Sequence, residues 1–233
     1  MANSISATTE IVTYFTTLPV LELIAVVASL LYVVLAAKGN LWCWPAAILS
    51  TVLYTVIFYD VYLWMDSALQ LYYLLMAVYG WLCWRKNAVA SDLENNGTSA
   101  APRINSKELL YSQWTLQRHS IMIIALSFLS IVLGWLMATY TPTHFPYLDS
   151  ATTVFAIFAT YLLTQKVLEN WLYFVVIDVV SIYLYIEKGL TPTAALFACY
   201  VILASYGYWQ WRKLYLQQQQ NAVNDSDISP VLG

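Results

Sequence analysis

The amino-acid sequence predicts an all-α membrane protein in which seven transmembrane helices form two parallel three-helix repeats joined by one linker helix, a 3+1+3 arrangement. Three observations predict this fold. The 233 residues are 61% hydrophobic and only 10% charged, whereas soluble domains carry about 25% charged residues. The hydrophobic residues fall into seven long runs, and the chain resembles itself when Tyr79 is aligned with Tyr206. The composition excludes a soluble enzyme, a disulfide scaffold and, at a net charge of −3, a basic nucleic-acid surface.

Each predicted helix is an apolar run close to the roughly 20 residues that a helix needs to cross the hydrocarbon core of a membrane. No Lys or Arg precedes the first run, which is unlike a cleavable signal peptide, so we expect this run to remain as a helix. Residues 1–17 are expected outside, 85–120 as a cytoplasmic linker, and 212–233 as a cytoplasmic tail that is disordered after Leu216. The runs are 18–37, 41–59, 63–84, 121–140, 150–164, 168–186 and 191–211.

The ten Lys and Arg residues predict the orientation, because cytoplasmic loops carry the excess of positive charge. With the N-terminus outside and the C-terminus in the cytoplasm, nine of the ten face the cytoplasm and Lys188 alone faces out. An even number of helices would place Arg212 and Lys213 on the same side as the N-terminus, which has no basic residue. The charge pattern therefore favours seven helices.

An internal repeat relates residues 18–84 to residues 150–211. The segment YGWLCWRK, which begins at Tyr79, matches YGYWQWRK, which begins at Tyr206. The same alignment, extended without a gap, pairs Trp44 with Trp171 and Tyr73 with Tyr200. An odd number of helices between the two repeats gives both the same orientation, which is a known transporter architecture with the substrate near the membrane midplane.

Ionisable and amide side chains inside the predicted spans are candidate site residues, because a polar group in the hydrocarbon core is costly unless it faces a partner or a cavity. Asp178 lies in the middle of the sixth span, where it either binds substrate or locks two helices together. Gln70 lies about two turns inside the third span and is expected to line the site. Four carboxylates near the outer span ends would concentrate a cation; they are Glu22, Asp60, Asp66 and Asp149.

Aromatic side chains lie deeper in the spans than a membrane-interface belt requires. With Trp44 and Trp171 they are expected to form two walls on either side of a central cavity, suited to a small, planar, cationic ligand. No metal site, cofactor or enzyme activity is expected, since His119 and His144 are predicted on opposite sides of the membrane and no hydrolase or nucleotide-binding motif occurs. The deeper aromatic residues are Tyr54, Tyr72, Tyr73, Tyr183 and Tyr200.

Four segments carry a resemblance to a known family: residues 44–84, FPYLDS at 145–150, residues 169–190 and the closing GYWQWRK. Through them the chain resembles the Pnu family of bacterial vitamin transporters. The resemblance covers roughly 18–213. It implies a SWEET-like fold, often a homotrimer, and inner-membrane uptake of a vitamin by facilitated diffusion with alternating access. It also implies that a cytoplasmic kinase traps the vitamin by phosphorylation. The family's ligand-contacting positions fall on Gln70, Trp81, Trp84, Asn170, Trp171 and Asp178.

Two departures from the nicotinamide riboside branch of that family bear on the substrate. Phe174 stands where a Trp is expected, and Ala77 stands where an Asn is expected, and both changes remove hydrogen-bonding capacity. The sequence therefore places thiamine slightly ahead of nicotinamide riboside, with riboflavin third. A more distant alternative is a non-transporting membrane scaffold, which the polar linker and tail would serve.

Overall fold

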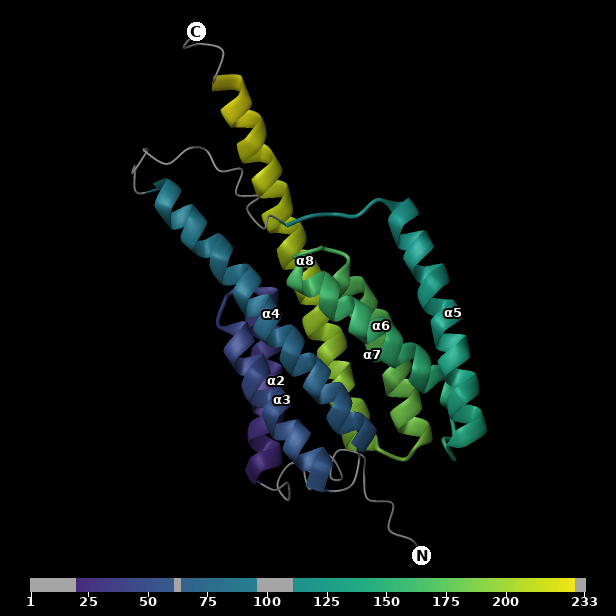
Figure 1. Ribbon diagram of the computed structural model, residues 1–233. Coiled ribbons are helices and arrows are strands. Elements are labelled where there is room, and N and C mark those ends of the chain that lie inside the picture. Colours follow the sequence, from purple (N-terminus) through teal and green to yellow (C-terminus); the bar gives the residue numbers. More distant parts are fainter. Residues whose placement is uncertain (1–19, 61–63, 96–110, 229–233) are drawn as a thin grey trace, which may run out of the picture.

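The computed structural model describes residues 20–60, 64–95 and 111–228, and these residues form seven helices packed as one bundle (Figure 1). The described residues contain no strand; an isolated parallel bridge joins Ser112 to Val167. The predicted all-α class is confirmed. The helices are α2 (Val20–Ala37), α3 (Cys43–Asp60), α4 (Trp64–Asn95), α5 (Leu116–Tyr140), α6 (Pro146–Thr164), α7 (Asn170–Glu187) and α8 (Thr191–Ile228).

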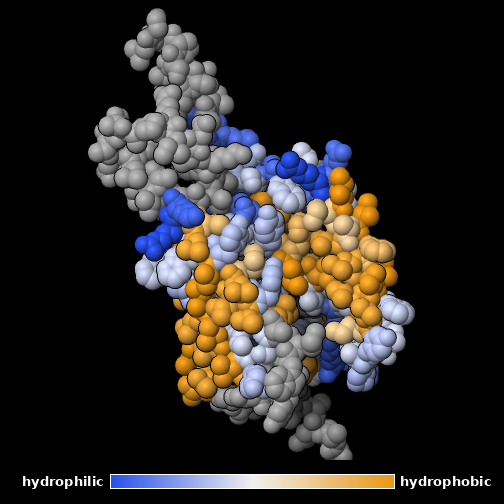
Figure 2. Space-filling view, viewed as in Figure 1, coloured by the Kyte–Doolittle hydropathy of each residue, from blue (hydrophilic) through white to orange (hydrophobic). Residues whose placement is uncertain are grey.

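Several helices present apolar side chains outward. Helices α2, α5 and α7 are long and apolar enough to span a membrane, and α3 carries a shorter apolar stretch, Cys43–Ile57. On α5, Ile124 is 71% exposed and Phe128 is 70% exposed, which would be unfavourable in water. Apolar side chains cover much of the visible side of the bundle, while hydrophilic ones gather at the end from which α8 projects (Figure 2).

Two helices continue beyond their predicted ends. Helix α4 runs to Asn95, into the predicted linker, and α8 runs to Ile228, so the prediction of a disordered tail is wrong for the described part of it. These extensions contain few bulky apolar residues but many good helix formers such as Lys, Arg, Gln, Leu and Ala. On α8, Gln219 Nε2 also donates to the Tyr215 hydroxyl one turn away, at 2.7 Å. The helical conformation of these segments follows from the helix propensity of their residues, which does not depend on hydrophobicity.

The helix boundaries recur along the chain in the alignment that pairs Tyr79 with Tyr206. Helices α3 and α7 have both their first and their last residues at aligned positions. The last residues of α2 and α6 are also aligned, and so are the first residues of α4 and α8. We call α2–α4 the first unit and α6–α8 the second unit. Within each unit the middle helix packs on both others, and between units α2 contacts α8 and α4 contacts α6. Helix α5 packs against α6.

A close contact between a glycine and an indole ring occurs at the same place in both units. A Cβ atom on Gly80 would lie 2.2 Å from Cη2 of Trp44, and one on Gly207 would lie 2.6 Å from Cδ2 of Trp171. Both distances are too short for any side chain. Each glycine therefore lets the third helix of its unit approach the indole on the middle helix.

We expect Gly80→Ala and Gly207→Ala each to lower the free energy of unfolding by about 1–3 kcal/mol, the usual cost of overpacking a well-packed core. The added methyl group must displace a buried indole. Thermal unfolding of the purified protein in detergent measures this change.

The control is Ser205→Ala, on the exposed side of α8 near Gly207. Its hydroxyl bonds within the helix to the Val201 carbonyl, so its loss should change stability little. Equal stability of the glycine variants and this control would show that the two indoles are not tightly held.

Candidate functional site

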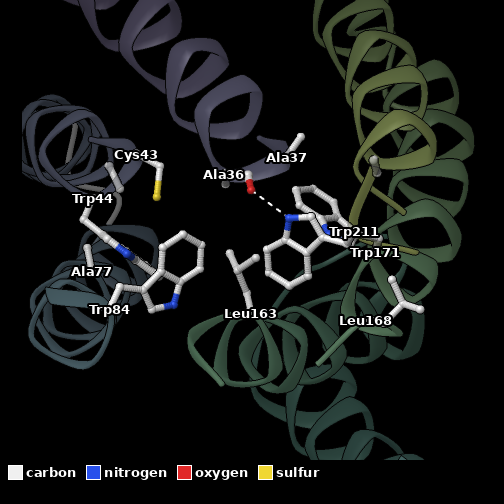
Figure 3. Close-up of a cluster of buried hydrophobic side chains, with 12 residues drawn as sticks. Ala36, Ala37, Cys43, Trp44, Ala77, Trp84, Leu163, Leu168, Trp171 and Trp211 are labelled. Atoms are coloured by element: carbon white, nitrogen blue, oxygen red, sulfur yellow. Dashed lines mark hydrogen bonds between the residues drawn. The ribbon is translucent and has the colours of Figure 1, made fainter. Parts of the chain in front are cut away.

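Four buried tryptophans form a continuous row within the larger core cluster, and we call this row the indole layer (Figure 3). Their side chains are 0–3% exposed. The ring centroids of Trp44 and Trp84 are 5.2 Å apart, those of Trp84 and Trp211 are 6.1 Å apart, and those of Trp211 and Trp171 are 5.4 Å apart. The two outer contacts are edge-to-face, the arrangement that aromatic quadrupoles favour. The indole layer thus runs from the first unit into the second.

Reciprocal hydrogen bonds join the two units at the indole layer. Trp84 Nε1, on α4, donates to the carbonyl of Thr164 at the end of α6, at 3.1 Å. Trp211 Nε1, on α8, donates to the carbonyl of Ala36 near the end of α2, at 3.0 Å. Both acceptors lie at helix ends, where carbonyls lack intrahelical partners, and the Ala36 carbonyl also accepts from the Gly39 N–H at 2.9 Å.

The other two indoles of the layer lack such partners. Trp44 Nε1 and Trp171 Nε1 are buried and make no hydrogen bond to any described residue. Beside Trp171, the Asn170 amide donates to the Val167 carbonyl, while its Oδ1 atom is buried without a donor. A buried polar group without a partner costs about 1–3 kcal/mol, so it requires an explanation such as a ligand or an ordered water. Two donors and one acceptor at the starts of α3 and α7 are therefore without a described partner.

Asp178 lies two helical turns along α7 from Trp171, roughly 10 Å at 1.5 Å per residue, and on the same face. The Asp178 carboxyl group is buried and makes no hydrogen bond to another described residue. Among the described residues, therefore, no hydrogen bond from Asp178 locks two helices together. Tyr200 of α8 lies within its electrostatic range and hydrogen-bonds to the hydroxyl of Ser29 on α2, at 2.8 Å. The equivalent position in the first unit is Thr51, which is neutral. One buried carboxyl group therefore lies near the interface between the units, where the first unit has a hydroxyl.

The remaining predicted site residues lie on α4. Tyr73 and Tyr72 contact each other edge-to-face, and the Tyr72 hydroxyl donates to the Ile157 carbonyl of α6 at 3.2 Å. Gln70 is half-buried one turn before Tyr73, and Trp81 packs against the core cluster that contains the indole layer. The structure thus groups Trp44, Trp84, Trp171 and Asn170 at one level, and places Asp178 with Tyr200 at another.

The four predicted outer carboxylates do not form an unpaired cluster in the described residues. Asp149 pairs with Lys188, the one basic residue expected outside, at 2.9 Å. The side chains of Asp60 and Asp66 lie outside the part described. The Asp149 pair neutralises one of the charges on which the prediction of a cation-concentrating mouth depended.

Sequence reasoning missed two residues of this region. Trp211 is one of the two inner members of the indole layer, and the repeat alignment that pairs it with Trp84 already contained the signal. Ser29 was missed because nothing in its apolar helix distinguishes it from the Ser and Thr residues that bond to their own backbone.

The comparisons with known proteins agree on one family. The family model described as nicotinamide mononucleotide transporter matches residues 19–213. The chain is similar to the nicotinamide riboside transporter PnuC of Escherichia coli, with 21% identity over 82% of this chain and 84% of that protein. It is similar to the same transporter of Neisseria mucosa, with 26% identity over 82% and 71% of the two chains. The riboflavin/roseoflavin transporter RibM of Streptomyces davaonensis shares 22% over 82% and 83%.

Among solved structures, the fold resembles the crystal structure of the vitamin B3 transporter PnuC with a TM-score of 0.64 and 23% identity, over 91% of this chain and 89% of that one. This likeness covers most of the chain. Together with the match of the family model to most of the chain, it leads to one conclusion. The chain belongs to the nicotinamide mononucleotide transporter family and is a multi-pass vitamin transporter of the bacterial inner membrane.

Proposed function

We propose that the protein carries nicotinamide riboside into the cell by alternating access, and that the vitamin binds between the first and second units beside the indole layer. The observation that carries this proposal is that three of the five buried side-chain atoms without a hydrogen-bond partner among the described residues belong to or adjoin the indole layer, namely Trp44 Nε1, Trp171 Nε1 and Asn170 Oδ1. A carboxamide has an oxygen that accepts from an indole N–H and an amide that donates to Asn170 Oδ1. Nicotinamide riboside also carries ribose hydroxyls and a cationic ring.

The proposal includes a parallel 3+1+3 repeat of seven transmembrane helices. Its support is the alignment of matching helix ends between the units and the exchanged contacts of α2 with α8 and of α4 with α6. The reciprocal indole hydrogen bonds have the same symmetry, since Trp84 and Trp211 are aligned by the repeat. A pair of units related in this way moves between two access states by rocking about their interface.

We place the C-terminus in the cytoplasm and the N-terminus outside. Seven basic residues in the described ranges support this orientation, because the helix ends and loops that carry them lie at the end of the bundle from which α8 projects or on that projection (Figure 1). Lys188 lies at the opposite end, between α7 and α8. Positive charge of this distribution is typical of a cytoplasmic face. The seven residues are Lys38, Arg85, Lys86, Arg118, Lys166, Arg212 and Lys213.

The comparisons favour nicotinamide riboside over thiamine, the first choice from the sequence. That choice depended on Ala77 and Phe174, which lack the hydrogen-bonding groups of the Asn and Trp expected at these positions. Ala77 is 2% exposed within the core cluster, and Phe174 packs against the same cluster. Packing in the core therefore offers a reason other than the ligand for the apolar side chains at these two positions. Relatives that cover most of this chain are nicotinamide riboside transporters, which supports the same substrate here.

Asp178 is proposed as the partner of the cationic ring. It is buried on the Trp171 face of α7, near the second unit's contact with α2, and has no helix-locking hydrogen bond among the described residues. The second unit has a carboxyl group at this position, and the equivalent residue of the first unit is the neutral Thr51. One acidic group matches a ligand with one positive charge. Coulomb attraction is stronger there than at the surface, because the effective dielectric constant is lower.

Two further elements of the proposal come from the family resemblance. Uptake is by facilitated diffusion, and a cytoplasmic kinase retains the vitamin as its phosphate. The exposed apolar face of α5 is a candidate contact between copies of a homotrimer, because α5 packs against α6 and leaves Ile124 and Phe128 outward.

The test of the substrate is uptake of labelled vitamins into liposomes that contain the folded protein. Nicotinamide riboside should equilibrate without ATP or an ion gradient, at a rate about tenfold or more above that of thiamine, which corresponds to ~1.4 kcal/mol of preference. Faster uptake of thiamine would reverse the substrate assignment. Uptake of none of the family's vitamins would remove the carrier function itself.

Asp178→Asn should weaken nicotinamide riboside binding about tenfold or more, which corresponds to ~1.4 kcal/mol, because it removes the charge and keeps the side-chain shape. Calorimetric titration of the purified protein measures this affinity. Asp149→Asn is the matched control, because the same change removes a charge that is already paired with Lys188. Lower stability of Asp178→Asn with an unchanged affinity would identify Asp178 as a structural residue.

A further inference from the structure

A short extended segment crosses the end of the bundle from which α8 projects, next to the indole layer (Figure 1). We call residues 111–114, which precede α5, the strap. The Ser112 N–H donates to the Lys166 carbonyl at 3.1 Å, and the Leu168 N–H donates to the Ser112 carbonyl at 2.9 Å. The Tyr111 N–H donates to Gln218 Oε1 of α8 at 3.1 Å, and Gln218 Nε2 donates back to the Tyr111 carbonyl at 3.4 Å. The backbone of the strap is therefore attached to the second unit.

The side chain of Tyr111 extends from this attachment to the first unit. Its ring contacts the Trp211 indole edge-on, with centroids 5.1 Å apart. Its hydroxyl lies over Gly39 in the α2–α3 loop, where a Cβ atom would be 2.2 Å from the hydroxyl oxygen. Gly39 has φ +66°, a conformation that glycine adopts without strain. Burial raises the pKa of Tyr111 to about 12, so the hydroxyl at this contact is neutral at physiological pH.

Lys166, in the α6–α7 loop, contacts both the indole layer and Tyr111. Its Nζ atom lies 4.9 Å from the centre of the Trp84 ring and 5.1 Å from the centre of the Tyr111 ring. Lys166 is the residue that the repeat aligns with Gly39, and it has φ +52°, which is rare outside glycine. The equivalent loop position is thus a glycine in one unit and a cation in the other, and Tyr111 contacts both.

We propose that Tyr111 and Lys166 form the cytoplasmic gate of this carrier, closed in the present structure, in which the Lys166 ammonium group occupies the face of Trp84 that a cationic ligand must use to leave. This inference rests on the proposed function and orientation. When the units rock apart, the strap stays hydrogen-bonded to the second unit while the contact of the Tyr111 hydroxyl with Gly39 breaks. A pyridinium ring that reaches Trp84 competes with the ammonium group for the same π face, because both are cations.

The native thiol of Cys43 reports on this gate. Cys43 is fully buried at the start of α3 and lies within electrostatic range of both Tyr111 and Lys166. In a Cys83→Ser, Cys199→Ser background it is the one remaining cysteine of the chain. A charged, membrane-impermeant thiol reagent added to inside-out vesicles then reaches it from the cytoplasmic side, and the labelling rate reports the population of open molecules.

Tyr111→Ala and Lys166→Met should each raise this rate about tenfold, and Tyr111→Phe, which keeps the ring, should raise it by a smaller factor. Gln218→Ala is a milder variant outside the apolar part of α8, and loss of its two hydrogen bonds to the strap should also raise the rate. Gln113→Ala, an exposed strap position, is the control and should leave the rate unchanged.

Labelling of Tyr111→Ala, Lys166→Met and Gln218→Ala at the rate of the Gln113→Ala control, in protein with an unchanged unfolding temperature, would overturn the gate. Faster labelling in right-side-out rather than inside-out vesicles would overturn its cytoplasmic assignment. Uptake of nicotinamide riboside by the unmodified chain is measured separately, so a wrong substrate is distinguished from a wrong gate. Faster labelling of the variants from the cytoplasmic side supports the gate whichever vitamin is carried.

Discussion

The structure depends on a reciprocal pair of hydrogen bonds in which an indole of each unit donates to a helix-end carbonyl of the other. Trp84 reaches Thr164 and Trp211 reaches Ala36, at 3.1 and 3.0 Å. Both bonds are buried, where an unpaired carbonyl or N–H is costly. They place the third helix of each unit against the first helix of the other. The same arrangement brings Trp44 and Trp171 into the layer, each against a glycine that leaves room for its ring.

The contrast among the four indoles separates the residues that join the units from those available to a ligand. Trp84 and Trp211 use their N–H groups between the units, whereas Trp44 and Trp171 have no described partner. The repeat duplicates the packing but not the charge, since Asp178 is aligned with Thr51 and Lys166 with Gly39. A nearly symmetric frame thus carries an asymmetric set of charges, with the anion near the proposed binding site and the cation at the proposed exit.

Much of this organisation is predictable from sequence, because it follows from patterns along the chain. Apolar runs predict all seven helices, and repeat alignment identifies Trp44, Trp84 and Trp171 as related positions. The ends of α4 and α8 are missed, since helix propensity rather than hydrophobicity continues them. The strap is missed because its contacts join Ser112 to Lys166 and Tyr111 to Gln218, far apart in sequence and without any periodic signal. The comparisons favour nicotinamide riboside, the second choice from the sequence, and the burial of Ala77 and Phe174, which weakens the argument for thiamine, appears only in three dimensions.

The central claim is that the two indole N–H groups without partners receive the ligand. Indole N–H resonances of isotope-labelled protein in detergent micelles, assigned by single Trp→Phe variants, test it during titration with nicotinamide riboside. The account predicts that the resonances of Trp44 and Trp171 shift saturably, while those of Trp84 and Trp211, already hydrogen-bonded, shift much less. Unchanged Trp44 and Trp171 resonances, in a preparation that binds the vitamin, would contradict it.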